Sequence, residues 1–167
     1  MKKIISIIIL IVIIIGGFYL LFSYSSNQLN AQNLISAIEE NDIDKFEKLL
    51  KKRGDIDAKP NVVCLDCTNY PPLHMACKLG NFEAVKLLVE NGADVNNVNA
   101  TNNTSPLIAA LRTHNSNGIE VAKYLINKGA DISYMNLQGY TPVNASLRLN
   151  TNPYNEDVAK AQYDFVV

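Results

Sequence analysis

Two stretches of the chain are near copies of each other. Residues 81–95 read NFEAVKLLVENGADV, and residues 118–132 read GIEVAKYLINKGADI. In each copy, apolar residues recur at the spacing of one helix face, and a glycine then supplies the backbone conformation that ends a helix. A unit this short cannot bury its apolar face alone, so successive units must stack and share a core. The pattern predicts an all-α repeat architecture.

A shorter helix is expected before each copy. It begins at Pro72 in one unit and at Pro106 in the next, because proline fixes φ at a helix start. Gly80 is expected to end the first of these helices in a left-handed conformation. A further copy starts at residues 140–143, and a degenerate first copy covers residues 34–56. The chain therefore holds about four helix–turn–helix units.

These features resemble the ankyrin repeat, a unit of about 33 residues with a Thr-Pro-Leu-His signature and a Gly-Ala-Asp turn. The signature is matched by PLHMA at 72–76 and SPLIAA at 105–110, and the turn by GAD at 92–94 and 129–131. The resemblance covers about residues 33–163. It implies an ankyrin-repeat solenoid with extended turns and with a last unit that caps the stack. The expected repeats are about 33–69, 70–103, 104–138 and 139–167.

The N-terminal segment has a different composition. Residues 4–22 carry no charge, and Lys2 and Lys3 precede them. Nineteen helical residues span about 28 Å, which is close to the hydrocarbon thickness of a bilayer. Because the positive side of a span stays in the cytoplasm, the rest of the chain is expected outside. A signal peptide cleaved near residues 23–25 is the alternative.

The expected domain organisation follows from these two patterns. Residues 1–22 form an N-terminal membrane anchor or signal segment. Residues 23–32 are polar and predict a short flexible linker. Residues 33–167 form the repeat domain.

Charge and motif content exclude several classes of function. Fifteen Lys plus Arg against 16 Asp plus Glu leave a net charge of −1, whereas nucleic-acid binders usually carry a basic surplus. The chain has no glycine-rich phosphate loop or dinucleotide fingerprint, and its two histidines assemble no catalytic constellation. We therefore expect no enzyme activity, no cofactor, no nucleic acid and no small-molecule substrate.

The cysteines are compatible with three hypotheses: a disulfide, a redox site and a zinc site. Cys64 and Cys67 lie in a lengthened turn and could form a disulfide in an oxidising compartment. Their C-x-x-C spacing also suits redox exchange. With His74 and Cys77 they would make a zinc ligand set. The ankyrin resemblance implies instead that His74 serves backbone hydrogen bonds and that Cys77 fills a small buried position, so no metal site is predicted.

A binding surface is the main functional expectation. Stacked repeats form a concave surface from their turns and first helices, and the family resemblance implies that partners contact the turn tips and the exposed positions of the first helices. The first-helix positions are Lys78, Leu79, Leu111, Arg112, Leu147 and Arg148, and the turn positions are Tyr70, Asn99, Asn102, Thr104, Tyr134, Met135, Leu137 and Tyr140.

The resemblance, taken with the N-terminal segment, implies a protein-binding module on the outer side of a cytoplasmic membrane. The expected location is a bacterial inner membrane, crossed once by residues 4–22, with the repeats in the periplasm. Small exported ankyrin proteins of bacteria that look similar act as immunity proteins or as accessory factors for an envelope enzyme. Secretion after signal cleavage is one alternative, and a redox or metal-handling protein using Cys64 and Cys67 is another.

Overall fold

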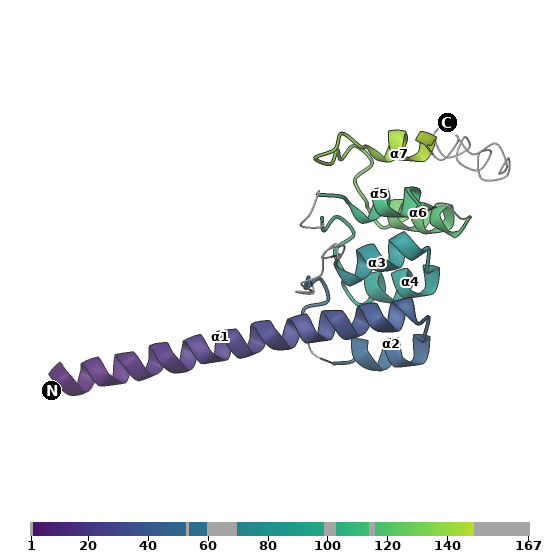
Figure 1. Cartoon of the computed structure of the whole chain (residues 1–167). Coiled ribbons are helices and arrows are strands. Elements are labelled where there is room, and N and C mark those ends of the chain that lie inside the picture. The colour runs from purple at the N-terminus through teal and green to yellow at the C-terminus, as the bar shows by residue number, and fades with distance from the viewer. Residues whose placement is uncertain (1, 53, 60–69, 99–102, 114–115, 149–167) are drawn as a thin grey trace.

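A computed structural model of the chain describes residues 2–52, 54–59, 70–98, 103–113 and 116–148. Within these ranges the chain forms helices and no strands, and successive helix pairs stack in one row (Figure 1). The expected all-α repeat architecture is confirmed. The helices are α1 (Lys2–Glu39), α2 (Ile43–Leu50), α3 (Pro72–Leu79), α4 (Phe82–Glu90), α5 (Pro106–Leu111), α6 (Asn117–Asn127) and α7 (Pro142–Arg148).

The ends of the second repeat's helices follow from its sequence. Pro72 is the first residue of α3, and Gly80 ends that helix with φ of 66°. The Asn81 side chain accepts a hydrogen bond from the Ala84 amide at 3.1 Å and so caps α4. Local sequence alone therefore sets where both helices of this pair begin.

The core runs the length of the stack and is shared between repeats. Each buried Leu, Ile, Val or Phe contributes about 1.5–3 kcal/mol relative to its exposed state. Because α3 packs against α1 on one side and α5 on the other, neighbouring repeats share this core. The largest fully buried apolar side chains are Phe46, Leu34, Leu73, Leu88, Leu107, Ile108, Leu111, Leu125, Val85 and Val121, and Ile38 is 2 % exposed.

The apolar N-terminal segment and the first repeat share one helix. α1 runs without interruption for 38 residues, and its end from Ala31 to Ile38 packs into the core against α2 and α3. The expectation of a flexible linker at residues 23–32 is wrong, because this segment is helical. No Gly or Pro occurs between Phe18 and Glu39 to break the helix, and burial of its last two turns holds it in place.

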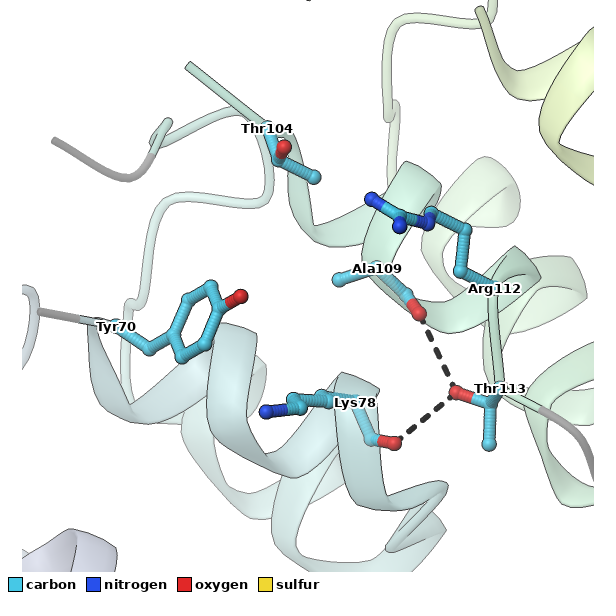
Figure 2. Close-up of a pocket in the computed structure, with 6 residues that line it drawn as sticks. All are labelled: Tyr70, Lys78, Thr104, Ala109, Arg112 and Thr113. Atoms are coloured by element: carbon cyan, nitrogen blue, oxygen red, sulfur yellow. Dashed lines mark hydrogen bonds between the residues drawn. The ribbon is translucent and has the colours of Figure 1, made fainter. Parts of the chain in front are cut away.

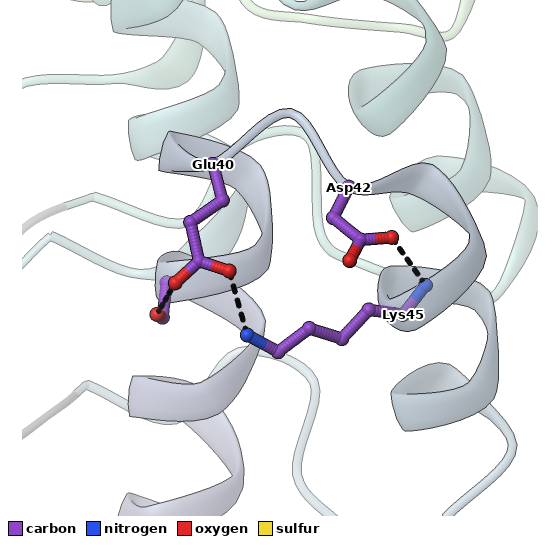
Figure 3. A network of polar contacts seen from close by, with 4 residues as sticks. Glu40, Asp42 and Lys45 are labelled. Atoms are coloured by element: carbon purple, nitrogen blue, oxygen red, sulfur yellow. Dashed lines mark hydrogen bonds and ion pairs between the residues drawn. The ribbon is translucent and has the colours of Figure 1, made fainter.

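A polar turn joins α1 to α2 on the side of the stack opposite to the entry of α1 (Figure 3). The Asp42 carboxylate caps α2 by accepting from the Lys45 amide at 2.9 Å. The Lys45 ammonium also pairs with Glu40 at 2.7 Å, and Ser36 donates to the same carboxylate. The hydrogen bond from Lys45, aided by the one from Ser36, lowers the pKa of Glu40. These groups are exposed, so their contribution to stability is small.

The turns between repeats are stacked by a row of hydrogen bonds. One Asp57 oxygen accepts from the Asp94 amide of the next turn at 3.1 Å, and Asn96 Oδ1 accepts from the Asp131 amide at 2.8 Å. The first turn is held against α1, because the Asp55 amide donates to Asn27 Oδ1 at 3.4 Å. Figure 1 shows all these turns on the side of the stack from which α1 enters.

His74 links the second repeat to the third from inside the stack. Its ring is fully buried, and Nε2 lies 2.6 Å from the Thr104 carbonyl oxygen. A carbonyl can only accept, so Nε2 carries the proton. Burial lowers the pKa of His74 to about 4, against an opposing effect of the Thr104 bond and with a small contribution from Lys59. The imidazole is therefore neutral at pH 7, and its bond is the backbone contact expected of this position.

The His74 environment makes stability pH-dependent. The pKa falls from 6.5 in the unfolded chain to about 4 in the folded one, so the unfolded chain takes up the proton first. The contribution of neutral His74 to the free energy of unfolding is fully present above about pH 6.5. It decreases by roughly 3 kcal/mol as the pH drops to about 4. Chemical unfolding of the full chain in detergent at pH 7 and 4.5 measures this loss. A His74→Gln variant, which keeps a donor but does not titrate, should flatten it; an unchanged slope would contradict the assignment.

Asp57 and Asp131 lie in opposite electrostatic environments. Burial raises the pKa of Asp57, whereas hydrogen bonds from Ser133 lower the pKa of Asp131. Asp57→Asn keeps an acceptor for the next turn, as Asn96 does, and removes a poorly solvated charge. We expect the thermal midpoint to rise for Asp57→Asn and to fall for Asp131→Asn. Shifts in the same direction for both variants would refute this account of the turns.

Candidate functional site

A pocket opens between α3 and α5, on the face formed by the first helices of the repeats (Figure 2). Its volume is about 280 Å³. This volume lies at the small end of the range for ligand pockets and is large enough for one or two side chains of a partner. Its lining residues are Tyr70, Lys78, Thr104, Ala109, Arg112 and Thr113.

Thr113 joins the two helices at the base of the pocket. Its hydroxyl lies 3.2 Å from the Lys78 carbonyl and 3.3 Å from the Ala109 carbonyl, as Figure 2 shows. The Cys77 carbonyl is also within reach, at 3.1 Å. Carbonyls in the last turn of a helix lack partners within the helix, and one hydroxyl proton serves those of α3 and α5 in turn. The spacing of the two helices is thereby fixed.

Thr104 forms a rigid wall of the pocket. Its carbonyl meets His74 of the preceding repeat, and its hydroxyl oxygen accepts from the Asn136 amide group at 3.0 Å. Asn136 Oδ1 in turn accepts from the Gln138 and Tyr140 amides. Thr104 and Asn136 together therefore connect three successive repeats, from His74 to Tyr140, and this holds the wall in place without a ligand.

Two cations lie over aromatic rings at the pocket. Lys78 Nζ is 5.0 Å from the Tyr70 ring centroid, and Tyr70 itself stacks on His74 at 6.3 Å. Arg112 Cζ is 5.0 Å from the centroid of Tyr140, which belongs to the following repeat. Such contacts contribute about 0.5–1 kcal/mol at exposed sites. They orient the two charges without neutralising them.

Neither cation is paired with a carboxylate in the part of the chain that the structure describes, where the ion pair recorded joins Lys45 to Glu40. Among the described residues that line the pocket, none is acidic. The pocket is therefore positively charged, has an aromatic wall, and is preformed. This combination can bind a carboxylate, and its arginine can do so with two parallel hydrogen bonds.

The structure agrees with some of the expected first-helix positions and corrects one. Lys78, Leu79 and Arg112 are exposed. Leu111 was expected at the surface and is 2 % exposed. It is the fifth residue after the proline that begins its helix, as Cys77 is in α3, and this position points into the core in both repeats. Arg148 is the last residue of α7, at the position of Lys78 and Arg112 in their repeats.

Of the expected turn positions, Thr104 is buried and Tyr70 is half-buried at the pocket. The other turn positions within the described residues divide into two groups. Met135 and Leu137 are exposed, by 63 % and 74 %. Tyr134 and Tyr140 are half-buried and pack against the core. The remaining turn positions, Asn99 and Asn102, lie outside the described residues, as do Cys64 and Cys67.

Cys77 and His74, which the zinc hypothesis required as ligands, are both buried in the core. Cys77 is fully buried, and burial raises the pKa of its thiol, which keeps it protonated. The Nε2 atom of His74 is bound to Thr104. Sequence reasoning did not anticipate the parts played by Thr113 and Asn136. Each is a polar residue that the structure buries, and the visible signal was Thr113 standing where Leu79 stands in the preceding repeat.

Comparison with known proteins agrees with the helix stacking. The sequence model for ankyrin repeats in three copies matches residues 34–136. "Ankyrin repeat and SAM domain-containing protein 6" of Rattus norvegicus is 36 % identical over 104 residues, which is 62 % of this chain and 11 % of that protein. "Putative ankyrin repeat protein FPV031" of fowlpox virus is 28 % identical over 119 residues, which is 71 % of this chain and 33 % of that protein.

A third relative shows how widely the repeat is distributed. "Potassium channel AKT1" of Arabidopsis thaliana is 39 % identical over 72 residues, which is 41 % of this chain and 8 % of that protein. The chain thus spans a third or less of the length of each of these relatives, and what it shares with them is the repeat. The chain belongs to the ankyrin repeat family.

Proposed function

We propose that this chain is a membrane-anchored module that binds an acidic group of a partner protein in the pocket between α3 and α5. Ankyrin repeats indicate a protein–protein interaction module, and the family is generally non-enzymatic. The observation that carries the proposal is the placement of Lys78 and Arg112 at one preformed pocket, where neither pairs with a carboxylate of the described residues. The group that binds in the pocket is an Asp or Glu side chain of the partner.

The pocket has the properties of an energetically important contact. Arg and Tyr are enriched among the residues that dominate binding energy. Here Arg112 and Tyr70 are held by neighbouring groups before binding, so little side-chain entropy remains to be lost. Leu79 follows Lys78 directly at the end of α3 and is exposed, so it offers the partner an apolar side chain on the same helix. A partner segment that pairs an acidic with an apolar residue fits this surface.

The proposed anchor is the N-terminal part of α1. One helix near the N-terminus, within Leu10–Glu39, is long and apolar enough to cross a membrane. All side chains from Leu10 to Phe22 are exposed, and a continuous apolar surface of this size is unfavourable in water. Lys2 and Lys3 favour retention of the N-terminus in the cytoplasm. The repeats would then lie on the outer side, in the periplasm if the membrane is a bacterial inner membrane.

The biological role that we propose for this arrangement is capture of a protein at the outer face of the membrane. An immunity role and an accessory role for an envelope enzyme both fit that geometry, and the identity of the partner distinguishes them. Release of the repeats by cleavage near residues 23–25 would leave the pocket unchanged, since its residues lie in the second and third repeats.

Site-specific photo-crosslinking tests the binding surface. A photoreactive amino acid replaces Leu79, the exposed residue that follows Lys78 on α3, in the full chain expressed in intact cells. We expect one discrete adduct with a partner protein. The matched control places the same group at Lys123, which is exposed on α6 away from the pocket. Equal labelling from both positions would contradict a specific surface between α3 and α5.

Charge reversal tests the chemistry of the pocket. Lys78→Glu with Arg112→Glu should reduce partner affinity roughly thirtyfold, the equivalent of about 2 kcal/mol. Lys86→Glu with Lys123→Glu makes the same change in net charge on α4 and α6 and should leave affinity within about twofold. Binding of the captured partner, titrated against each variant, gives both values. Equal losses in the two variants would show that net charge, not the pocket, governs binding.

A further inference from the structure

The turns between repeats point back toward the apolar end of α1. Each helix of the stack lies roughly along α1, and the turns that join one repeat to the next lie on the side from which α1 enters (Figure 1). The contact of Asp55 with Asn27 places the first turn beside that part of α1. The hydrogen bonds from Asp57 to Asp94 and from Asn96 to Asp131 align the following turns with it.

This alignment sets the height of the turns above a membrane that α1 crosses. Asn27 follows the last residue of the apolar run, Phe22, by five residues, which is about 7.5 Å of helix. The polar headgroup layer on each side of a bilayer is about 5–8 Å thick. The bases of the turns therefore stand at the outer edge of that layer, and their tips extend farther toward the lipid.

The third turn has the composition of a membrane-contacting segment. Residues 132–141 carry no charge. Ile132, Met135 and Leu137 are exposed there, with Leu137 at 74 %. Tyr134 and Tyr140, which are amphipathic and favoured at membrane interfaces, flank the tip. By contrast, the turn between α1 and α2, on the other side of the stack, carries Glu40 and Asp42.

The shape of this turn is fixed before any contact. The Asn136 amide donates to the Tyr140 carbonyl at 3.0 Å, and the Gly139 amide donates to the Asn136 carbonyl at 3.0 Å. The exposed Leu137 thus lies at the apex of a closed turn. Its exposure is a property of a defined backbone, and an apolar side chain presented in this way needs a surface to cover it.

We infer that the turn at residues 132–141 rests in the headgroup layer of the membrane that α1 crosses, with Met135 and Leu137 in contact with lipid. This inference rests on the anchor proposed above. Spanning helices tilt by about 20° on average, and the third turn lies farther from α1 than the other turns that the structure describes, so tilt moves it most. Contact at this turn would favour the tilt that lowers the stack onto the bilayer.

The chain contains no tryptophan, so one introduced tryptophan is the only source of tryptophan fluorescence and reports the environment of its own site. Three full-length variants are reconstituted in phosphatidylcholine vesicles containing a brominated lipid quencher. Phe18→Trp reports the anchor, Leu137→Trp reports the turn, and Leu79→Trp, at the C-terminal end of α3, reports the side of the stack away from the turns. We expect the emission of Phe18→Trp and Leu137→Trp to be quenched and shifted to shorter wavelength, and that of Leu79→Trp to match an aqueous tryptophan.

The outcomes separate the anchor from the turn. Quenching at Phe18→Trp with aqueous emission at Leu137→Trp leaves the anchor in place and overturns the inference. No quenching at Phe18→Trp refutes the anchor, and the inference with it. Because tryptophan itself favours interfaces, Tyr134→Trp is also compared with and without Met135→Ser and Leu137→Ser. Loss of its quenching in the serine background supports lipid contact by these two side chains, and unchanged quenching contradicts it.

Discussion

No helix pair of this chain can bury its apolar face within itself, and the rest of the structure follows from that constraint. Each first helix packs against the first helices on either side, and at the N-terminal end the chain uses α1 for this purpose. Burial of Ala31, Leu34 and Ile38 in the core makes the end of α1 a structural part of the first repeat. The helix that carries the N-terminal apolar run is therefore also the first layer of the stack.

Buried polar groups convert this stacking into defined geometry. Apolar contacts are not directional, so they bring helices together without fixing their relative position to a fraction of an ångström. The bonds from His74 to Thr104, from Asn136 to Thr104 and from Thr113 to the α3 carbonyls supply direction. The pocket lies among these bonds, and its shape is set by the same groups that hold the repeats in register.

Local signals in the sequence were sufficient for the helices and their ends, because Pro72, Gly80 and Asn81 act through their own backbone. Counting along a helix was less reliable: Leu111 was placed one position off and is buried rather than exposed. The helical segment at residues 23–32 was missed because its stability comes from the packed turns that follow it. The pocket was beyond sequence reasoning, since Lys78 meets a ring of its own repeat while Arg112 meets one of the next.

The continuity of α1 has a consequence for direction as well as for height. Each residue of an α-helix turns the chain by about 100° and advances it by about 1.5 Å. Because α1 is continuous between Phe22 and Ala31, the number of residues between the apolar run and the first buried side chain fixes the rotation of the stack about the axis of α1. One residue inserted there would advance the repeats by only about 1.5 Å but rotate their open face by about 100°, so in the membrane-anchored arrangement proposed above that face would meet a different neighbour.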